Sequence, residues 1–190
     1  MTYCFYWVSK QQEINPYWTL FFALLEESVF DEGILGFEEK SLEEKNSSYS
    51  KYKKKLEVDL DSDLLDILLV FQDSTMTNLI ATCQVKKSLQ DTSKHISDIQ
   101  KGIIQKKHRG TKVLNLMFLE VAKRCLSQGV ELLTLDVRKN SRAHKMWIYY
   151  GFKQYGTLED YSRFEKVKYE GSFLFQKSKD LLHKCKSIEN

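Results

Sequence analysis

Hydrophobic positions in the second half of the chain follow a helical period and then a strand period. From Val113 to Leu126 apolar side chains recur at three- to four-residue spacing, which predicts an amphipathic helix. Gly129 is expected to be its C-cap, and residues 131–137 form a short apolar segment that predicts a strand. The expected core stripe of the helix is Leu114, Met117, Phe118, Val121 and Cys125.

The rest of the second half again predicts a helix followed by strands. Residues 141–150 predict a short helix that ends at Gly151. Residues 152–156 and 171–176 then predict two final strands. Because strands and helices alternate here, this half favours α/β packing around a mixed sheet.

In the first half, Asn15 and Pro16 predict the start of a helix that ends near Ser28, with Asn15 as N-cap. Residues 73–78 have turn composition, so the apolar segments on either side predict a β-hairpin. The expected strands of this half are residues 2–9, 64–72, 79–86 and 95–105. The predicted order is strand, helices, three strands, helix, strand, helix and two strands, in a single domain of residues 1–190.

Residues 46–55 are rich in Lys and Ser, and we expect them to form a mobile loop. The run contains Lys51, Lys53, Lys54 and Lys55, which we interpret as a solvated face of a loop or helix. No aromatic-rich RNA motif or zinc-finger spacing accompanies the run, so nucleic acid is not an expected partner.

Composition narrows the class of protein further. Hydrophobic residues make up 42% of the sequence, enough for a packed core, and the net charge of +3 selects no partner. The four cysteines lie far apart in sequence, so we expect reduced thiols and no sequence-local metal site. The N-terminal segment lacks a basic n-region, and the apolar run 18–25 is too short to span a bilayer. A cytoplasmic protein with no membrane association is therefore expected.

Residues 95–176 contain a motif series whose order is more specific than any one of its parts. Leu135, Asp136 and Val137 end a predicted strand, Asn140 and Ala143 follow, and Gly151-Phe152 closes the short helix. In this register the segment resembles the GNAT superfamily of N-acetyltransferases. Further on, the sequence is similar to the small-molecule branch that includes tabtoxin-resistance-type enzymes, through three residues: Gly156, Tyr161 and Gly171.

The resemblance implies a GNAT-like mixed, mostly antiparallel central sheet flanked by helices, in the order β-α-α-β-β-β-α-β-α-β-β. It implies acetyl-CoA as cosubstrate, bound by residues 95–176, which also hold the catalytic groups. Residues 1–60 match the family least and would form a divergent acceptor-side region, together with a loop at 155–168. A monomer or a homodimer, with a small-molecule or peptide amine as acceptor, is expected.

The turn before the long helix is the expected phosphate site. The family pattern is Q/R-x-x-G-x-G/A, and the matching stretch is Arg109, Gly110, Thr111, Lys112, Val113 and Leu114, with Gln105 just upstream. Amides at a helix start favour a pyrophosphate, and glycine lets it approach the backbone. Arg109 and Gly110 match the pattern, whereas Lys112 and Leu114 replace small residues. The alternative is an ordinary basic helix start, with Leu114 in the core.

The strand before this turn would offer backbone groups to the pantetheine arm at Ile103 and Ile104, whose side chains are equally explained as core. Asp98 matches a position often held by Glu in the branch, and such a carboxylate would act as general base toward an ammonium group. The alternative for Asp98 is an exposed carboxylate at a strand edge.

The short helix would carry the group that assists the departing thiolate. The family Tyr, four residues before the Gly-Phe pair, is replaced by Trp147, whose indole N–H donates a hydrogen bond but is no useful acid. Tyr150 would substitute for it, and core packing is the alternative for both side chains. Asn140 and Ala143 would contact the CoA arm, and Asn140 would alternatively be the helix N-cap.

Three hypotheses follow from the sequence. The first is an N-acetyltransferase that acetylates a primary amine, of a small molecule by preference, by direct transfer in a ternary complex. The second is a catalytically degenerate GNAT-fold binding protein, which Lys112, Leu114 and Trp147 would favour. The third is a protein-acetylating effector or toxin, which a mobile basic stretch at 46–55 would permit.

Overall fold

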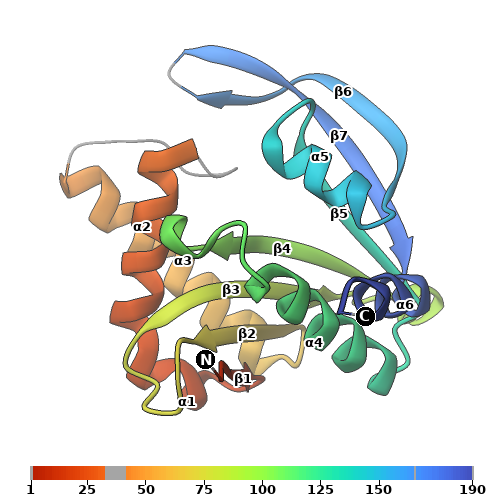
Figure 1. Ribbon diagram of the computed structural model, residues 1–190. Coiled ribbons are helices and arrows are strands. Elements are labelled where there is room, and N and C mark those ends of the chain that lie inside the picture. Colours follow the sequence, from red (N-terminus) through yellow and green to blue (C-terminus); the bar gives the residue numbers. More distant parts are fainter. Residues whose placement is uncertain (1, 33–41, 165, 190) are drawn as a thin grey trace. The chain divides into compact units, whose positions relative to one another are not determined.

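The computed structural model describes residues 2–32, 42–164 and 166–189 (Figure 1). The described strands follow the order β1-β2-β3-β4-β5-β7-β6 in one seven-stranded sheet. The pair β4–β5 is parallel, and the pairs β1–β2, β2–β3, β5–β7 and β6–β7 are antiparallel, which confirms the expected mixed, mostly antiparallel sheet. The strands are β1 (Cys4–Val8), β2 (Leu65–Phe71), β3 (Leu79–Lys87), β4 (Ile96–Ile104), β5 (Leu132–Arg138), β6 (Lys153–Phe164) and β7 (Val167–Lys177).

The helices lie between these strands in the expected order, with additions. The α-helices are α1 (Gln11–Ile14), α2 (Trp18–Glu32), α3 (Leu42–Asp61), α4 (Val113–Ser127), α5 (Arg142–Tyr149) and α6 (Ser178–Glu189). Three short 3₁₀ turns are η1 (Asn15–Tyr17), η2 (Asp91–Ser93) and η3 (Lys106–His108). No helix among the described residues is both long enough and apolar enough to cross a membrane. The chain forms two compact units, and β4 and α4 each contribute to both.

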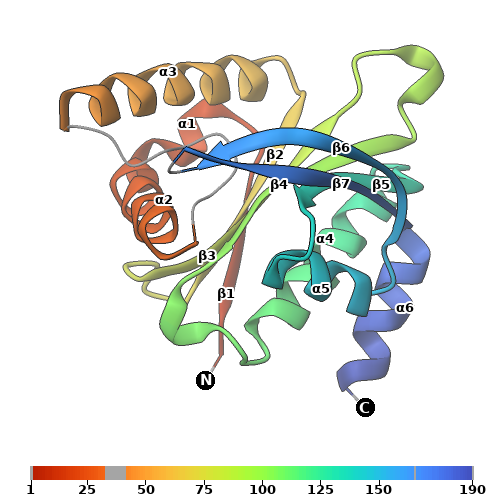
Figure 2. The ribbon, with the colours of Figure 1, turned by 90° about the horizontal axis from the view of Figure 1, so that it is seen from above.

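The first unit consists of Met1–Lys86 and Gln100–Met117 and contains strands β1, β2 and β3. Every residue of β2 is buried, which is typical of a strand covered on both faces, and its one charged residue, Asp66, accepts a hydrogen bond from the Ser9 hydroxyl at 2.6 Å. Helices α2 and α3 cover one face of these strands (Figure 2), where Phe21, Leu56 and Leu60 pack against Leu69 and other apolar side chains.

Two local predictions in this unit are wrong. Asn15 does not cap a long helix, because it ends α1, and its side-chain oxygen accepts a hydrogen bond from Trp18 Nε1 at 3.3 Å. Residues 46–55 are not a loop but lie within α3, whose inner face carries Tyr49, Tyr52, Leu56 and Leu60 at helical spacing. The exposed lysines of this run, Lys51, Lys54 and Lys55, are a solvated helix face as expected.

The second unit consists of Lys87–Ile99 and Phe118–Asn190. Along β5 buried and half-buried residues alternate strictly, which assigns one face of this strand to the core. An aromatic cluster forms part of that core, where the Phe118 ring stacks on Trp147 at 4.6 Å between centroids and meets Tyr150 edge-on at 4.7 Å. Helix α6 also buries Leu181 and Cys185.

The second unit differs from expectation at two places. The expected loop 155–168 instead lies almost entirely in the antiparallel pair β6–β7, which is much longer than the two short strands that the sequence predicted. Helix α6 was not predicted, although Leu181 and Cys185 have the four-residue spacing of a buried helix face. In α4, Leu114 was expected in the core but is only half-buried. Val113 is buried in its place.

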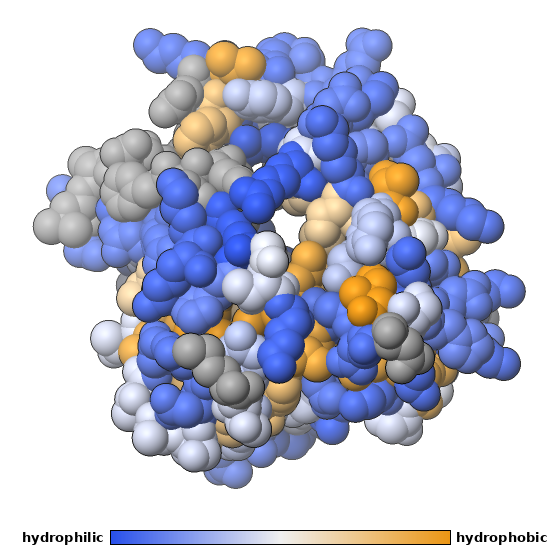
Figure 3. Space-filling model, in the orientation of Figure 1, coloured by the Kyte–Doolittle hydropathy of each residue, from blue (hydrophilic) through white to orange (hydrophobic). Residues whose placement is uncertain are grey.

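The thiols and the surface agree with a folded core and reduced cysteines. All four cysteines are free, and Cys83, Cys125 and Cys185 are buried. Large exposed apolar side chains are spread over several parts of the sequence and include Val58, Leu89 and the neighbours Ile148 and Tyr149. In the view of Figure 3 the hydrophobic areas are accordingly small and separated by hydrophilic ones.

Gly171 of β7 provides a test of packing in the second unit. A Cβ at this position would lie 2.5 Å from Cδ1 and 2.9 Å from Cβ of Tyr161, so Gly171→Ala must displace that ring. We expect a loss of about 1–3 kcal/mol in the free energy of unfolding, measured by urea denaturation. Gly156→Ala is the matched control, because its Cβ would meet only Phe173 at 4.0 Å. Equal losses in both variants would contradict the described packing.

Candidate active site

The turn between β4 and α4 is held to the first unit by defined hydrogen bonds. Gln105 N–H donates to the Ile80 carbonyl at 2.8 Å, and Arg109 Nε donates to the Ile104 carbonyl at 3.0 Å. Gly110 follows with φ of +76°, a backbone conformation that glycine adopts without steric cost. The arginine and glycine of the expected phosphate motif therefore build the bend that leads into α4.

The amides that follow this bend are available to a ligand. Within the described residues, the backbone N–H groups of Gly110, Thr111, Lys112 and Leu114 have no acceptor. The Thr111 hydroxyl donates to the His108 carbonyl at 2.7 Å, which fixes the loop. Unpaired amides at the start of a fifteen-residue helix attract an anion by hydrogen bonding and by the helix dipole.

The two departures from the phosphate motif differ in their consequences. Lys112 is exposed, so its ammonium group adds positive charge beside the amides without filling the turn. A Cβ at Gly110 would meet no heavy atom within 4 Å, so the space at the bend itself is open. Leu114 is half-buried beside the open amides, and it is therefore the larger obstruction of the two.

Strand β4 carries a backbone distortion at Lys101, whose φ is +47° in the left-handed region. Non-glycine residues are seldom held there, and such positions cluster at ligand sites. Beyond it, Ile103 is buried in the core of the first unit, whereas Ile104 is half-buried. The side chain of Ile103 is thus explained by the core, and the backbone of this segment is the part left to meet a ligand.

Asp98 lies in the second unit on the half of β4 that pairs with β5. It is half-buried and accepts a hydrogen bond from the Thr134 hydroxyl at 2.9 Å. The alternative of an exposed strand-edge carboxylate is wrong, because β4 lies inside the sheet order and Asp98 pairs with Thr134. This environment suits a carboxylate that is held in place for proton transfer.

Trp147 of α5 and Tyr150, the C-cap of that helix, lie within the aromatic cluster. Trp147 is 6% exposed and stacks on Phe118, so the packing alternative describes its side chain. Burial, followed by the proximity of Cys185 and Tyr149, raises the pKa of Tyr150 to about 12. The Tyr150 phenol therefore stays protonated across the neutral pH range and is the better hydrogen-bond donor of the two.

The start of α5 separates two roles that Asn140 was expected to combine. Ser141 is the N-cap, because its hydroxyl accepts the His144 amide hydrogen at 3.0 Å, so the expectation that Asn140 caps the helix is wrong. Asn140 is exposed with φ of +63°, a conformation that asparagine tolerates better than most residues. Its amide remains available at the surface next to half-buried Ala143.

With this geometry described, the chain can be compared with known proteins. Neither a scan against protein-family models nor a search among curated proteins gives a match. Among solved structures, a GNAT-family acetyltransferase from Streptococcus pneumoniae aligns at a TM-score of 0.69 with 14% identity, covering 93% of this chain and 99% of that one. The chain has the GNAT fold.

Other structures that align with this chain are named for different acceptors. A protein assigned as a phosphinothricin N-acetyltransferase aligns at a TM-score of 0.66 with 10% identity, over 93% of this chain and 98% of that one. A ribosomal-protein-alanine N-acetyltransferase from Brucella melitensis aligns at 0.65 with 11% identity, over 93% and 99%. Small-molecule and protein acceptors thus both occur among structures of similar fold.

Sequence reasoning missed Glu27, which fixes the turn between β4 and α4. Its carboxylate accepts the Lys106 amide hydrogen at 2.9 Å and a hydrogen bond from Gln105 Nε2 at 3.1 Å. Glu27 is far from the turn in sequence, and no local motif marks it. Its neighbours Glu26 and Ser28 are also polar, so nothing in the local sequence distinguishes Glu27 from an ordinary solvent-facing helical residue.

The packing of Trp147 can be tested directly. We expect Trp147→Ala to lower the free energy of unfolding by roughly 3–5 kcal/mol, because it removes a buried ring stacked on Phe118. The measurement is chemical denaturation, with Tyr149→Ala on the same helix as control, since Tyr149 is 59% exposed. A Trp147→Ala variant of unchanged stability but altered activity would instead make the indole an active-site group.

Proposed function

We propose that this protein is an N-acetyltransferase that transfers an acetyl group from acetyl-CoA to a primary amine, preferably of a small molecule. Transfer would be direct, within a ternary complex. The observation that carries the proposal is the turn at Gly110, whose following amides lack acceptors among the described residues, in a chain with the GNAT fold. A pyrophosphate is the ligand for which such a turn is suited.

The residues present fit acetyl-CoA at the turn and the adjoining strand. Gly110, Thr111 and Lys112 would hold the pyrophosphate through amides and charge, with Arg109 and Val113 shaping the bend. The backbone near Ile103, Ile104 and Gln105 would meet the pantetheine arm, and Asn140 with Ala143 would line it from α5. The thioester supplies an activated acyl group with a thiol leaving group of pKa about 8.5, which needs little assistance.

On this proposal, Asp98 removes a proton from the acceptor's ammonium group. The Thr134 hydroxyl donates to one of its oxygens, so the carboxylate has a fixed orientation on β4. Tyr150 remains a protonated phenol and serves as hydrogen-bond donor toward the departing sulfur. Trp147 supports Tyr150 by packing against Phe118, which contacts both rings.

The acceptor would be bound by residues from the divergent region and from the β6–β7 pair. Residues 33–41 of that region lie outside the described residues. The third hypothesis, a protein-acetylating effector or toxin, loses its basis in the sequence because 46–55 are helical. The degenerate alternative keeps two supporting observations, half-buried Leu114 beside the turn and the burial of Trp147 where a catalytic tyrosine is expected. The assay below separates it from an active enzyme.

The first experiment measures cosubstrate binding. Acetyl-CoA at about 100 times its Kd should stabilise the protein by roughly 2.7 kcal/mol and raise the Tm by several degrees. Gly110→Asp should abolish this shift, because the new carboxylate would lie beside the phosphates. Release of free CoA thiol with a panel of amines then measures turnover, and a Tm shift without any turnover would favour the degenerate protein.

Gly129→Asp is the matched control for Gly110→Asp. Both glycines have φ of +76°, and a Cβ added at either meets no heavy atom within 4 Å, so the backbone strain of the two variants is alike. Gly129 lies at the opposite end of α4, where no phosphate is expected. The proposed phosphate site would be contradicted if Gly110→Asp retained acetyl-CoA binding, or if both variants lost it.

A further inference from the structure

Strand β6 contains an irregularity that changes where one side chain points. Its pairing with β7 shifts register first between Gln154 and Gly156. It then continues to Leu158, opposite Gly171, and resumes only at Ser162, opposite Tyr169. Three residues of β6 therefore face the single intervening residue of β7, and Asp160 among them has φ of +54°. Bulges of this kind re-aim side chains and are frequent next to active sites.

The side chain that the bulge re-aims is Tyr161. Its ring lies directly over Gly171, where the missing Cβ leaves room for it, and it meets Phe173 edge-on at 5.2 Å between centroids. Phe173 is the cross-strand partner of Asp136 in the β5–β7 pair, so the Tyr161 ring lies beside Asp136, and hydrogen bonding to Asp136 is one of the causes that raise the Tyr161 pKa. Of the three residues noted in the sequence, Gly156, Tyr161 and Gly171, the last two therefore pack against each other.

Asp136 lies on the same face of the sheet as Asp98. The alternation along β5 places Thr134 and Asp136 on its half-buried face, and Thr134 donates to Asp98 across the strand pair. Burial raises the pKa of Tyr161 to about 12, with further contributions from its hydrogen bond to Asp136 and from the charges of Asp136 and Asp98. One phenol is therefore close to both carboxylates.

The geometry points to Asp136, positioned by Tyr161, as the residue that selects an acceptor with a second cationic nitrogen. This inference rests on the proposed function, in which Asp98 takes the proton from the reacting amine. Asp136 would bind the other ammonium group, and the rings of Tyr161 and Phe173 would cover the methylene chain and favour the cation. The acceptor class is an aliphatic diamine.

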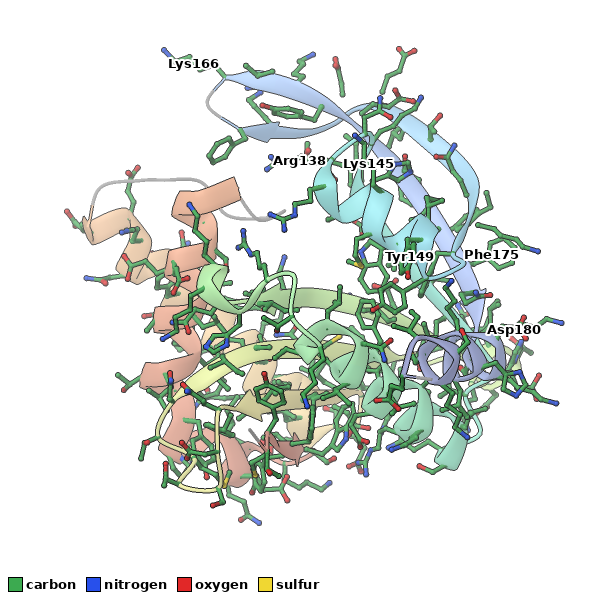
Figure 4. The ribbon with its side chains drawn as sticks, in the orientation of Figure 1. Arg138, Lys145, Tyr149, Lys166, Phe175 and Asp180 are labelled. Carbon is green, nitrogen blue, oxygen red and sulfur yellow. The ribbon has the colours of Figure 1, made fainter. Side chains whose placement is uncertain are left out.

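Strand geometry sets the length of this acceptor. Asp136 lies two residues beyond Thr134, the partner of Asp98, and one strand across, so the two Cα atoms are about 8 Å apart. An extended chain of roughly four to five methylene groups spans that separation. Beyond Asp136, Arg138 lies over the rings of Tyr169 and Phe164 at 4.7 and 5.2 Å (Figure 4), and its positive charge ends the anionic row.

The test compares putrescine and cadaverine with butylamine and pentylamine as acceptors. For the wild-type protein we expect kcat/KM to be about 10–100-fold higher for the diamines, the worth of one charge-assisted hydrogen bond. Asp136→Asn should remove this preference, so that the ratio of kcat/KM for each diamine to that for its monoamine falls to about one. Tyr161→Phe should reduce the preference in the same direction, because it removes the donor that positions Asp136.

Glu159→Gln is the control for the change in net charge, since Glu159 is an exposed carboxylate of the same bulge. Calorimetric titration of putrescine and butylamine into wild-type protein and Asp136→Asn gives a second readout that needs no turnover. Tighter putrescine binding that Asp136→Asn abolishes supports the inference even if no amine is acetylated, a result that would count against the proposed function alone. The inference is overturned if the wild type shows equal kcat/KM and equal affinity for diamines and monoamines, or if Asp136→Asn keeps the preference for diamines.

Discussion

The strict alternation of side chains along β5 is the constraint on which the second unit depends. Leu133, Leu135 and Val137 are buried, so the intervening residues must lie on the opposite, half-buried face. A shift of one residue in pairing would exchange the two sets and place Asp136 in the apolar core. One register therefore fixes both the hydrophobic packing and the position of the acidic side chains, and neither can change without the other.

The order of strands and helices could be predicted because each has a distinct period, and the errors arose where composition was weighed above periodicity. Residues 46–55 are polar enough to resemble a loop, yet Tyr49, Tyr52 and Leu56 recur at helical spacing and bury one side of α3. In the same way, Leu181 and Cys185 carried the signal for α6. The length of β6 and β7 could not be predicted, because an exposed two-stranded pair needs few apolar residues to mark it.

The candidate site was predictable only where it is contiguous in sequence. The turn at Arg109 and Gly110, the carboxylate Asp98 and the α5 aromatics each belong to a short motif, and the structure places them on the expected elements. Glu27 and Tyr161 act on residues that lie far from them along the chain. Their partners depend on helix packing and on a bulge in strand register, and neither leaves a local pattern in the sequence.

The bulge in β6 also bears on whether strands of two molecules can pair edge to edge. β6 is the last strand in the sheet order, so one side of its backbone is open to pairing with a strand of another molecule. A regular partner strand would lose its hydrogen-bond register across Glu159, Asp160 and Tyr161, and the charged side chains there would oppose close approach. The bulge that directs Tyr161 onto the face of the sheet therefore also interrupts the edge of β6 at which strands of other molecules could add to form a fibre.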